Sequence, residues 1–324
     1  MSSLIFAIEG RPTRQCHSAT LVETPSGLIA AWFGGRIEGS PDAGIWISRQ
    51  TELGWSLPTE IIAGTTFSPS HNPDSGQRKY VVPGPCWNPV LFRLREGVLL
   101  LFFKVGRAPR FWEGWLTRSL DGGWTWDEPR PLGRGPLGPL IGPVKNKPIQ
   151  RSDGVLLCPS STEGNKWLVH IEASLDLEHW EVFGPIEDSS RLGAIQPTLL
   201  FLPDGRLLAL CRTRSGFVAR SESLDEGQTW SPLAATTLKN PNAGIDAVTL
   251  KDGQLLLVYN NSDRSRSPLV AAVSEDGEHW RNQSALEEGT GEYSYPAVIQ
   301  GADGRVHAVY TWNRQGIGYV RIGV

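Results

Sequence analysis

One short phrase recurs six times along the sequence, and this repeat limits the possible folds more than any other feature of the chain. Each copy has a polar residue, often followed by proline, then an apolar strand, a turn that ends in glycine, and a second apolar strand. The copies span residues 17–33, 88–103, 147–159, 196–211, 246–259 and 295–310. Their turn glycines are Gly27, Gly97, Gly154, Gly205, Gly253 and Gly304, at intervals of 70, 57, 51, 48 and 51 residues. Because glycine supplies the positive φ of a tight hairpin turn, each copy predicts a β-hairpin.

A second motif, S-x-D-x-G-x-x-W, follows five of the hairpins. It is complete in residues 119–126 and 223–230, one residue shorter in 174–180 and 274–280, and degenerate in 48–55. In such a turn the serine and aspartate side chains bind nearby backbone N–H groups, while glycine adopts the left-handed conformation. The closing tryptophan anchors the turn in apolar surroundings. We therefore interpret these five tryptophans, out of 13 in the chain, as structural.

Six hairpins and five such turns in one uninterrupted chain predict an all-β fold, a six-bladed β-propeller. The sixth turn is missing at the chain ends, where residues 317–324 and 3–10 can complete one blade together. The ring would then be closed by N- and C-terminal strands. No linker divides the sequence, so we expect one domain over residues 1–324. The 36 glycines and 24 prolines also exclude a fold dominated by long helices.

Charge and composition exclude several classes of partner. A net charge of −3 with interspersed signs provides no basic face for nucleic acid or for an anionic membrane. No apolar run approaches about 18 residues, and the N-terminus lacks a signal-peptide pattern, so we expect a cytoplasmic chain. The four cysteines predict buried reduced thiols, and the six histidines form no metal-binding motif. We expect no metal or other cofactor, and the oligomeric state stays open.

A propeller brings equivalent positions of its repeat together around one axis. The residues that start the first strands are polar, namely Ser18, Asn88, Lys147, Gln196, Asp246 and Tyr295. Seven residues after the turn glycines, most positions are polar again: Gly34, Lys104, Ser161, Arg212, Asn260 and Thr311. Both sets belong to the same end of antiparallel strands. They are either solvated strand ends or the lining of one mouth of the channel, and their chemical types favour the lining. Nearby His17, Arg36, Asp42 and Arg264 make the predicted mouth cationic overall, which suits a carboxylated sugar.

The repeated turns and the six-bladed layout resemble the sialidase (neuraminidase) superfamily, in its BNR/Asp-box group, over nearly the whole chain. The resemblance implies a tyrosine nucleophile paired with a glutamate, an aspartate acid/base, and three arginines that hold a carboxylate. The implied acid/base is Asp42, and the implied nucleophile is Tyr295, with Tyr293 as second choice. The second arginine corresponds to Arg212. The third corresponds to Arg264, with Arg266 as second choice.

Two positions depart from the family pattern. His17 occupies the slot of the first arginine, and an imidazole lacks the guanidinium fork that matches a carboxylate. Gln196 occupies the slot of the glutamate, and an amide oxygen cannot accept the proton of an attacking phenol. Asp246 or Glu292 could replace it as the base.

We therefore expect a sialidase-like exo-glycoside hydrolase that acts on sialic acid or a related sugar acid and retains the anomeric configuration. Its expected catalytic residues are Tyr295, Asp42, Gln196 and His17, and its expected substrate-binding residues are Arg212, Arg264, Arg36, Lys147, Lys104, Asn88 and Asp246. One alternative is a uronate-polysaccharide lyase or a His-dependent glycosidase on the same propeller. Another is a non-catalytic glycan-binding propeller, which Gln196 keeps open. The segment 111–115 either contacts sugar through Trp112 and Glu113 or packs its aromatic rings.

Overall fold

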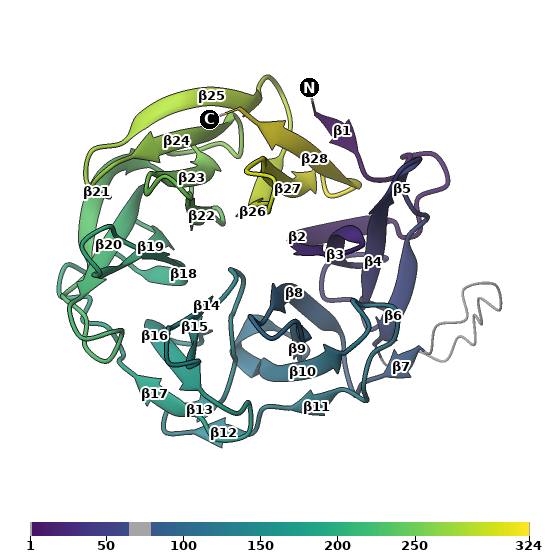
Figure 1. The fold of residues 1–324 in the computed structure, drawn as a ribbon, viewed down its shortest axis with the longest axis horizontal. Coiled ribbons are helices and arrows are strands. Elements are labelled where there is room, and N and C mark those ends of the chain that lie inside the picture. Colours follow the sequence, from purple (N-terminus) through teal and green to yellow (C-terminus); the bar gives the residue numbers. More distant parts are fainter. Residues whose placement is uncertain (1, 65–78, 324) are drawn as a thin grey trace.

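The computed structural model of the chain describes residues 2–64 and 79–323, and these residues form a ring of six blades around a central channel (Figure 1). The described residues contain no α-helix, and their one short helical turn is the 3-10 segment η1 (Pro109–Phe111). The prediction of an all-β, six-bladed propeller is confirmed. Among the described residues, no helix is long and apolar enough to span a membrane.

Each blade is built from antiparallel neighbours, and its first strand lies nearest the channel (Figure 1). Blade 1 runs outward as β2 (Gln15–Thr24), β3 (Gly27–Gly35), β4 (Gly44–Thr51) and β6 (Thr59–Ala63). Blade 2 runs outward as β8 (Cys86–Arg93), β9 (Leu99–Val105), β10 (Glu113–Ser119) and β11 (Arg130–Pro131). Blade 3 runs outward as β14 (Ile149–Gln150), β15 (Leu156–Glu163), β16 (Trp167–Ser174) and β17 (Glu181–Phe183). Blades 4 and 5 run outward as β18 (Ala194–Phe201), β19 (Leu207–Thr213), β20 (Phe217–Ser223), β21 (Ala234–Lys239); and β22 (Asp246–Thr249), β23 (Leu255–Asn260), β24 (Leu269–Ser274), β25 (Arg281–Glu287). Short strands β5 (Gly54–Trp55) and β7 (Tyr80–Val81) extend blade 1, and β12 (Arg134–Gly135) pairs with β13 (Gly138–Pro139).

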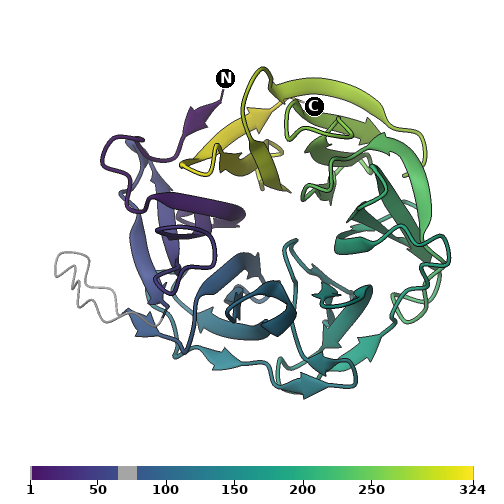
Figure 2. The ribbon, with the colours of Figure 1, turned by 180° about the vertical axis from the view of Figure 1, so that it is seen from behind.

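Blade 6 contains both ends of the chain, as the sequence predicted. It runs outward as β26 (Tyr293–Gln300), β27 (Val306–Trp312), β28 (Gly316–Ile322) and β1 (Ser3–Leu4), and the N-terminal strand lies at the outer edge of this blade (Figure 2). Ser3 pairs with Tyr319. Just after β1, the Phe6 ring is buried and lies 5.3 Å from the Trp32 ring of blade 1. The N-terminal segment therefore links blade 6 to blade 1 through both hydrogen bonds and apolar packing.

The unbroken apolar runs of the repeat follow from burial on both faces of a blade. In β23, Leu255 and Leu257 pack into the cluster shared with blade 4, whereas Leu256 and Val258 pack into the cluster shared with blade 6. Successive side chains of a strand point to opposite faces, so both faces need apolar residues. All four cysteines are buried and unpaired, as predicted.

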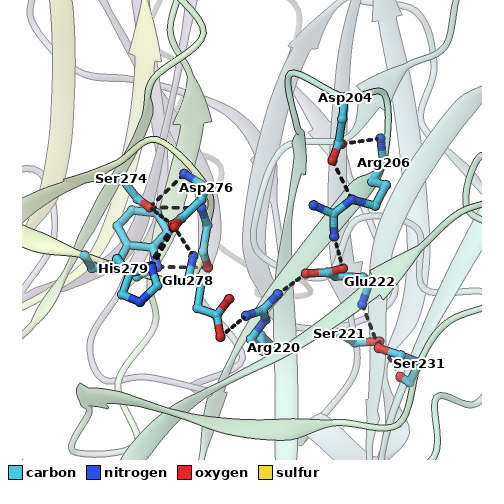
Figure 3. Close-up of polar contacts among 12 residues, drawn as sticks. Asp204, Arg206, Arg220, Ser221, Glu222, Ser231, Ser274, Asp276, Glu278 and His279 are labelled. Carbon is cyan, nitrogen blue, oxygen red and sulfur yellow. Dashed lines mark hydrogen bonds and ion pairs between the residues drawn. The ribbon is translucent and has the colours of Figure 1, made fainter.

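The S-x-D turns have the predicted hydrogen bonds. In blade 2 the backbone N–H of Gly123 donates to Ser119 Oγ at 2.7 Å, and Thr125 N–H donates to Asp121 at 2.9 Å. In blade 5, Asp276 Oδ1 accepts from the backbone N–H of His279 at 2.8 Å. Figure 3 shows this turn beside the charged residues of blade 4.

Four of the six strand-start positions are backbone bulges in the left-handed region, at Ser18, Asn88, Gln196 and Tyr295, with φ between 37° and 54°. At each of them the register between the first and second strands shifts. A bulge re-aims side chains and commonly occurs beside functional sites. The repeated polar-proline step therefore creates a local irregularity of the innermost strand in these four blades.

Residues 143–147, which precede β14, form a strap that contacts blades 2, 4, 5 and 6 across the channel. On one side its backbone carbonyls accept from the side chains of blade 2, with Asn88 Nδ2 at 3.2 Å from Val144 O. On the other side Lys145 Nζ donates to Ile245 O at 2.9 Å and to Pro296 O, and Asn146 Nδ2 donates to Pro197 O at 2.9 Å. We call residues 143–147 the channel strap.

Candidate functional site

The hydroxyl of Tyr295 and the guanidinium of Arg212 form the centre of the candidate site. Arg212 Nη1 donates to Tyr295 Oη at 2.5 Å and to Gln196 Oε1 at 3.1 Å. Arg212 Nε also donates to Asn242 Oδ1 at 2.9 Å, which fixes the plane of the guanidinium. The structure therefore brings together three residues that the sequence predicted for one site, and they come from blades 4 and 6.

Further cations and one imidazole surround the Tyr295 ring. Its centroid lies 4.2 Å from the His17 ring, 5.9 Å from Lys145 Nζ and 5.5 Å from the guanidinium carbon of Arg266. Gly244 leaves room for the ring, because a Cβ at that position would lie 3.1 Å from Tyr295 Cγ. The phenol is thus held by close packing within a strongly positive cluster.

His17 is almost completely buried, and neither of its ring nitrogens has a hydrogen-bond partner among the described residues. Burial lowers the pKa of His17 well below its ordinary value, and the positive charges of Arg314, Arg266, Arg212 and Lys145 lower it further. The imidazole is therefore neutral at physiological pH. A buried donor or acceptor without a partner costs free energy, so an incoming ligand that binds His17 would recover part of that cost.

Two carboxylates balance part of the positive charge. Glu292 accepts from Arg266 Nη1 at 2.6 Å and from Arg314 Nε at 3.0 Å. Although burial opposes it, the charges of Arg266 and Arg314 hold the pKa of Glu292 below its usual range. Arg314 also pairs with Glu38. Glu292, considered from the sequence as a base, is thus already bound by two arginines.

Arg314 is a member of the cluster that the sequence analysis missed. It lies in the β27–β28 turn, where both Asn313 and Arg314 have positive φ. No repeat position marks it, because the hairpins at other blades carry different residues there. The only available signal was its nearness in sequence to the end of the sixth repeat.

Gln196 links Arg212 to a further, partly buried carboxylate. Its Nε2 donates to Glu163 Oε1 at 2.9 Å, while its Oε1 accepts from Arg212. Burial raises the pKa of Glu163 above its ordinary value. A carboxyl group therefore lies one side chain away from the position where the family resemblance implies a glutamate.

Four predicted substrate-binding residues have partners within the protein instead. Lys147 pairs with Asp246 at 2.8 Å, and Asp246 also accepts from Thr198 and from the backbone of Val298. Asn88 and Lys104 both donate to the channel strap. These contacts join blades to one another, so Lys147, Asp246, Asn88 and Lys104 are structural in this arrangement, and both carboxylate oxygens of Asp246 already accept hydrogen bonds within the protein.

Most polar residues seven positions after the turn glycines also have hydrogen-bond partners within the protein. The hydroxyls of Ser161 and Thr311 accept from the backbone N–H of the next blade's bulge, at 3.1 Å in both cases. Asn260 Nδ2 donates to Tyr293 O at 2.8 Å. Arg212 differs, because it extends to a side chain across the channel. Tyr293, the second choice for nucleophile, is also buried, but of the two tyrosines Tyr295 is the one whose hydroxyl accepts a hydrogen bond from Arg212.

Asp42 and Arg36 lie at another part of the mouth. Arg36 Nε is 3.5 Å from Asp42 Oδ2, and both residues line a cavity of about 350 Å³ together with Trp46, Glu60 and Lys79. Partial burial acts in the opposite direction, but hydrogen bonds from Ser40 and from the Arg36 backbone lower the pKa of Asp42. Asp42 Oδ1 has no partner among the described residues. Within residues 2–64 and 79–323, no hydrogen bond, ion pair or ring contact joins Asp42 to Tyr295.

The geometry favours Arg266 over Arg264 as the third arginine. The Arg264 side chain is 90% exposed and lies 3.8 Å from Asp263. Arg266 faces Tyr295 and is tied to Glu292. The two arginines are separated by one residue in an irregular loop, so sequence spacing alone could not choose between them. The described residues contain no group of three or more histidine, cysteine, aspartate or glutamate side chains suited to a metal ion.

Comparisons with known proteins agree with the fold. The model of the BNR repeat-like domain family matches residues 26–308. A structure of a Dyadobacter fermentans protein of unknown function superposes with a TM-score of 0.79 at 17% identity, covering 99% of this chain and 97% of that chain. No curated protein sequence matches the chain significantly.

Two sialidase structures have the same propeller. The Hadza microbial sialidase Hz136 superposes with a TM-score of 0.80 at 19% identity, covering 100% of this chain and 68% of that chain. The intramolecular trans-sialidase from Ruminococcus gnavus, in complex with oseltamivir carboxylate, has a TM-score of 0.72 at 15% identity and covers 99% and 97% of the two chains. At these identities the comparison shows a shared fold.

Proposed function

Because the chain belongs to the BNR repeat-like domain family and has the sialidase propeller fold, we propose that it is a glycoside hydrolase that removes a carboxylated sugar. The observation that carries the proposal is the cluster around Tyr295, in which Arg212, Arg266, Lys145 and neutral His17 surround one phenol.

The cluster suits a carboxylate for electrostatic reasons. Arg212, Arg266 and Arg314 come from three separate chain segments, and within residues 2–64 and 79–323 Glu292 and Glu38 are the carboxylates that form ion pairs with them. A bound carboxylate would accept charge-assisted hydrogen bonds from the guanidinium groups in a partly desolvated site. It would also reduce the positive potential at His17, which makes protonation of the imidazole easier.

The proposed first step makes Tyr295 the nucleophile. Its O–H proton passes to His17, its oxygen bonds to the anomeric carbon, and the bond to the leaving oxygen breaks as Asp42 protonates that oxygen. In the second step water gives a proton to Asp42 and bonds to the anomeric carbon as the bond from that carbon to Tyr295 breaks. His17 then returns its proton to the phenolate. His17 here performs the task that Gln196 cannot perform.

The role of Asp42 predicts a pH dependence. The first step needs a protonated Asp42, and its pKa is lower than usual because of Ser40 and Arg36, despite the opposing effect of burial. The rate should therefore rise as the pH falls from 7 toward 5. Replacing Asp42 with asparagine should remove this rise for substrates with poor leaving groups.

The decisive experiment is sugar release from aryl sialosides and aryl uronides by the wild type and by Tyr295→Phe. Tyr319→Phe is the matched control, because the Tyr319 hydroxyl is also hydrogen-bonded, to His307 at 2.8 Å, but belongs to another cluster. We expect Tyr295→Phe to lose at least about a hundredfold in kcat, and Tyr319→Phe to keep its activity. Equal turnover by wild type and Tyr295→Phe would remove Tyr295 from the mechanism.

One observation favours a second candidate function, a glycan-binding propeller without catalysis. Asp42 has no contact with the Tyr295 cluster among the described residues, and Gln196 cannot act as a base. In that case calorimetry would detect binding of sugar acids that requires Arg212, while every aryl glycoside stays intact.

A further inference from the structure

Two groups of arginines stacked on aromatic rings lie in mouth-side loops outside the Tyr295 cluster. The first platform consists of Arg107, Arg110 and Phe111, in the loop between β9 and β10. The second platform consists of Trp167, which starts β16, and Arg214, which follows β19. Both loops follow strand ends that the repeat assigns to the same mouth as Tyr295.

In the first platform two cations lie over the ring of Phe111. The Arg107 guanidinium carbon lies 4.0 Å from the Phe111 ring centroid, and that of Arg110 lies 4.7 Å from it. Phe111 is 39% exposed, an unusual position for a phenylalanine that has buried aromatic neighbours. Trp112, by contrast, is buried, so the segment 111–115 splits into a packed tryptophan and an exposed phenylalanine.

A continuous row of rings connects the first platform with the Tyr295 cluster. Beyond His17, the Phe33 ring is 5.8 Å from the His17 ring, Trp87 is 5.7 Å from Phe33, and Trp112 is 5.5 Å from Trp87. Phe111 directly precedes Trp112 in the chain. The packed row gives the platform a rigid support and a fixed position relative to the cluster.

The second platform adjoins the cluster near Gln196 and Glu163. Arg214 stacks on Trp167 at 3.6 Å, measured from the guanidinium carbon to the ring centroid. Trp167 is the cross-strand partner of Glu163, whose carboxylate accepts from Gln196. Gly193 leaves room for the Arg214 side chain, because a Cβ at position 193 would lie 3.3 Å from Arg214 Cδ. The aliphatic part of the arginine is therefore closely packed.

The charges of both platforms are available to a ligand. Arg107, Arg110 and Arg214 form no ion pair with any carboxylate of the described residues, whereas most arginines of the cluster do. An aromatic face binds the apolar face of a sugar ring, and an adjacent unpaired guanidinium binds its carboxylate. Each platform therefore has the chemistry of a subsite for one acidic sugar residue.

We propose that the mouth binds an acidic oligosaccharide, with a terminal residue in the Tyr295 cluster and further carboxylated residues on the two platforms. This inference rests on the proposed function for the terminal residue and extends it from a single sugar to a chain. It also predicts that the platforms contribute to binding but not to bond cleavage.

The test compares monomers with tetramers by isothermal titration calorimetry. The probes are sialic acid against its α2,8-linked tetramer and galacturonic acid against tetragalacturonic acid, with maltotetraose as a neutral tetramer. We expect at least one acidic tetramer to bind about tenfold more tightly than its monomer. Phe111→Ala and Trp167→Ala should each weaken tetramer binding about fivefold and leave monomer binding unchanged.

Trp124→Ala is the matched control, because Arg49 stacks on Trp124 at 4.7 Å in the S-x-D turn at the opposite end of blade 2. This variant should bind every probe as the wild type does. Equal affinity for monomer and tetramer, or for acidic and neutral tetramers, would overturn the platform proposal while leaving Arg212-dependent monomer binding intact. A wild type that binds neither acidic monomer would instead overturn the proposed function.

Discussion

Replacing Gln196 with glutamate should bring two carboxyl groups into direct contact. In the wild type Gln196 Nε2 lies 2.9 Å from Glu163 Oε1 and donates a hydrogen bond to it. In Gln196→Glu this donor becomes an acceptor, and two negative charges about 4 Å apart repel by about 4 kcal/mol at an effective dielectric constant of about 20. Keeping one proton removes this repulsion, whereas Arg212, 3.1 Å from Gln196 Oε1, offsets only part of it.

Keeping that proton sets the expected loss of stability. Taking a carboxyl with an ordinary pKa near 4.5, protonation at pH 7 costs about 3 kcal/mol, and the cost grows by about 1.4 kcal/mol per pH unit. The native state then binds more protons than the unfolded state, so stability falls as the pH rises above that value. Gln196→Glu should therefore be close to the wild type at pH 5 and about 3 kcal/mol less stable at pH 7.

Urea unfolding at pH 5 and pH 7 measures this difference. The double variant Glu163→Gln with Gln196→Glu exchanges the two groups, so it should recover most of the stability at pH 7. It also puts a carboxylate beside Arg212 and the Tyr295 hydroxyl, which should raise kcat on aryl glycosides. A single variant Gln196→Glu that is as stable as the wild type at pH 7 would refute the contact between residues 163 and 196.

Three further changes test other parts of the structure. Arg266→Ala should raise the KM for an acidic aryl glycoside about tenfold, while Arg264→Ala, which removes an exposed side chain, should leave the KM unchanged. Wild-type His17 stays neutral when folded and gains a proton when unfolded, so the protein should lose stability below pH 6.5, by at most about 1.4 kcal/mol per pH unit. His17→Gln should abolish this loss. Identical urea-unfolding curves of the wild type at pH 7.5 and 5.5 would contradict this. Phe6→Ala should cost about 3 kcal/mol in urea unfolding, because Phe6 packs on Trp32 where the ring closes.

The repeat predicted the fold because it encodes both faces of a blade. The turn glycines and the S-x-D motifs mark tight turns, and the apolar runs mark strands that are buried on both faces. In β23, for example, alternate residues pack against the two neighbouring blades. The closure of blade 6 by β1 followed from the missing sixth turn. The sequence also placed Tyr295, Arg212, Gln196 and His17 at the channel, because all four lie at or beside repeat positions.

The rest of the site depended on contacts that no repeat encodes. Lys147 and Asp246 neutralise each other across the channel, and a list of polar positions cannot show which of them are used within the protein. Arg314 reaches the cluster from a hairpin turn, and the channel strap enters from a connection between blades. Asp42 points to Arg36 because the loop after β3 turns its two acidic residues in different directions, with Glu38 facing Arg314.

If the Tyr295 cluster holds the carboxylate of a sugar, a crystal soaked with a sugar acid will show it there. We expect the carboxylate within hydrogen-bond distance of Arg212 and Arg266, with the anomeric carbon facing Tyr295 Oη. A sugar acid bound only in the cavity beside Asp42 and Arg36, with the Tyr295 cluster unchanged, would contradict it.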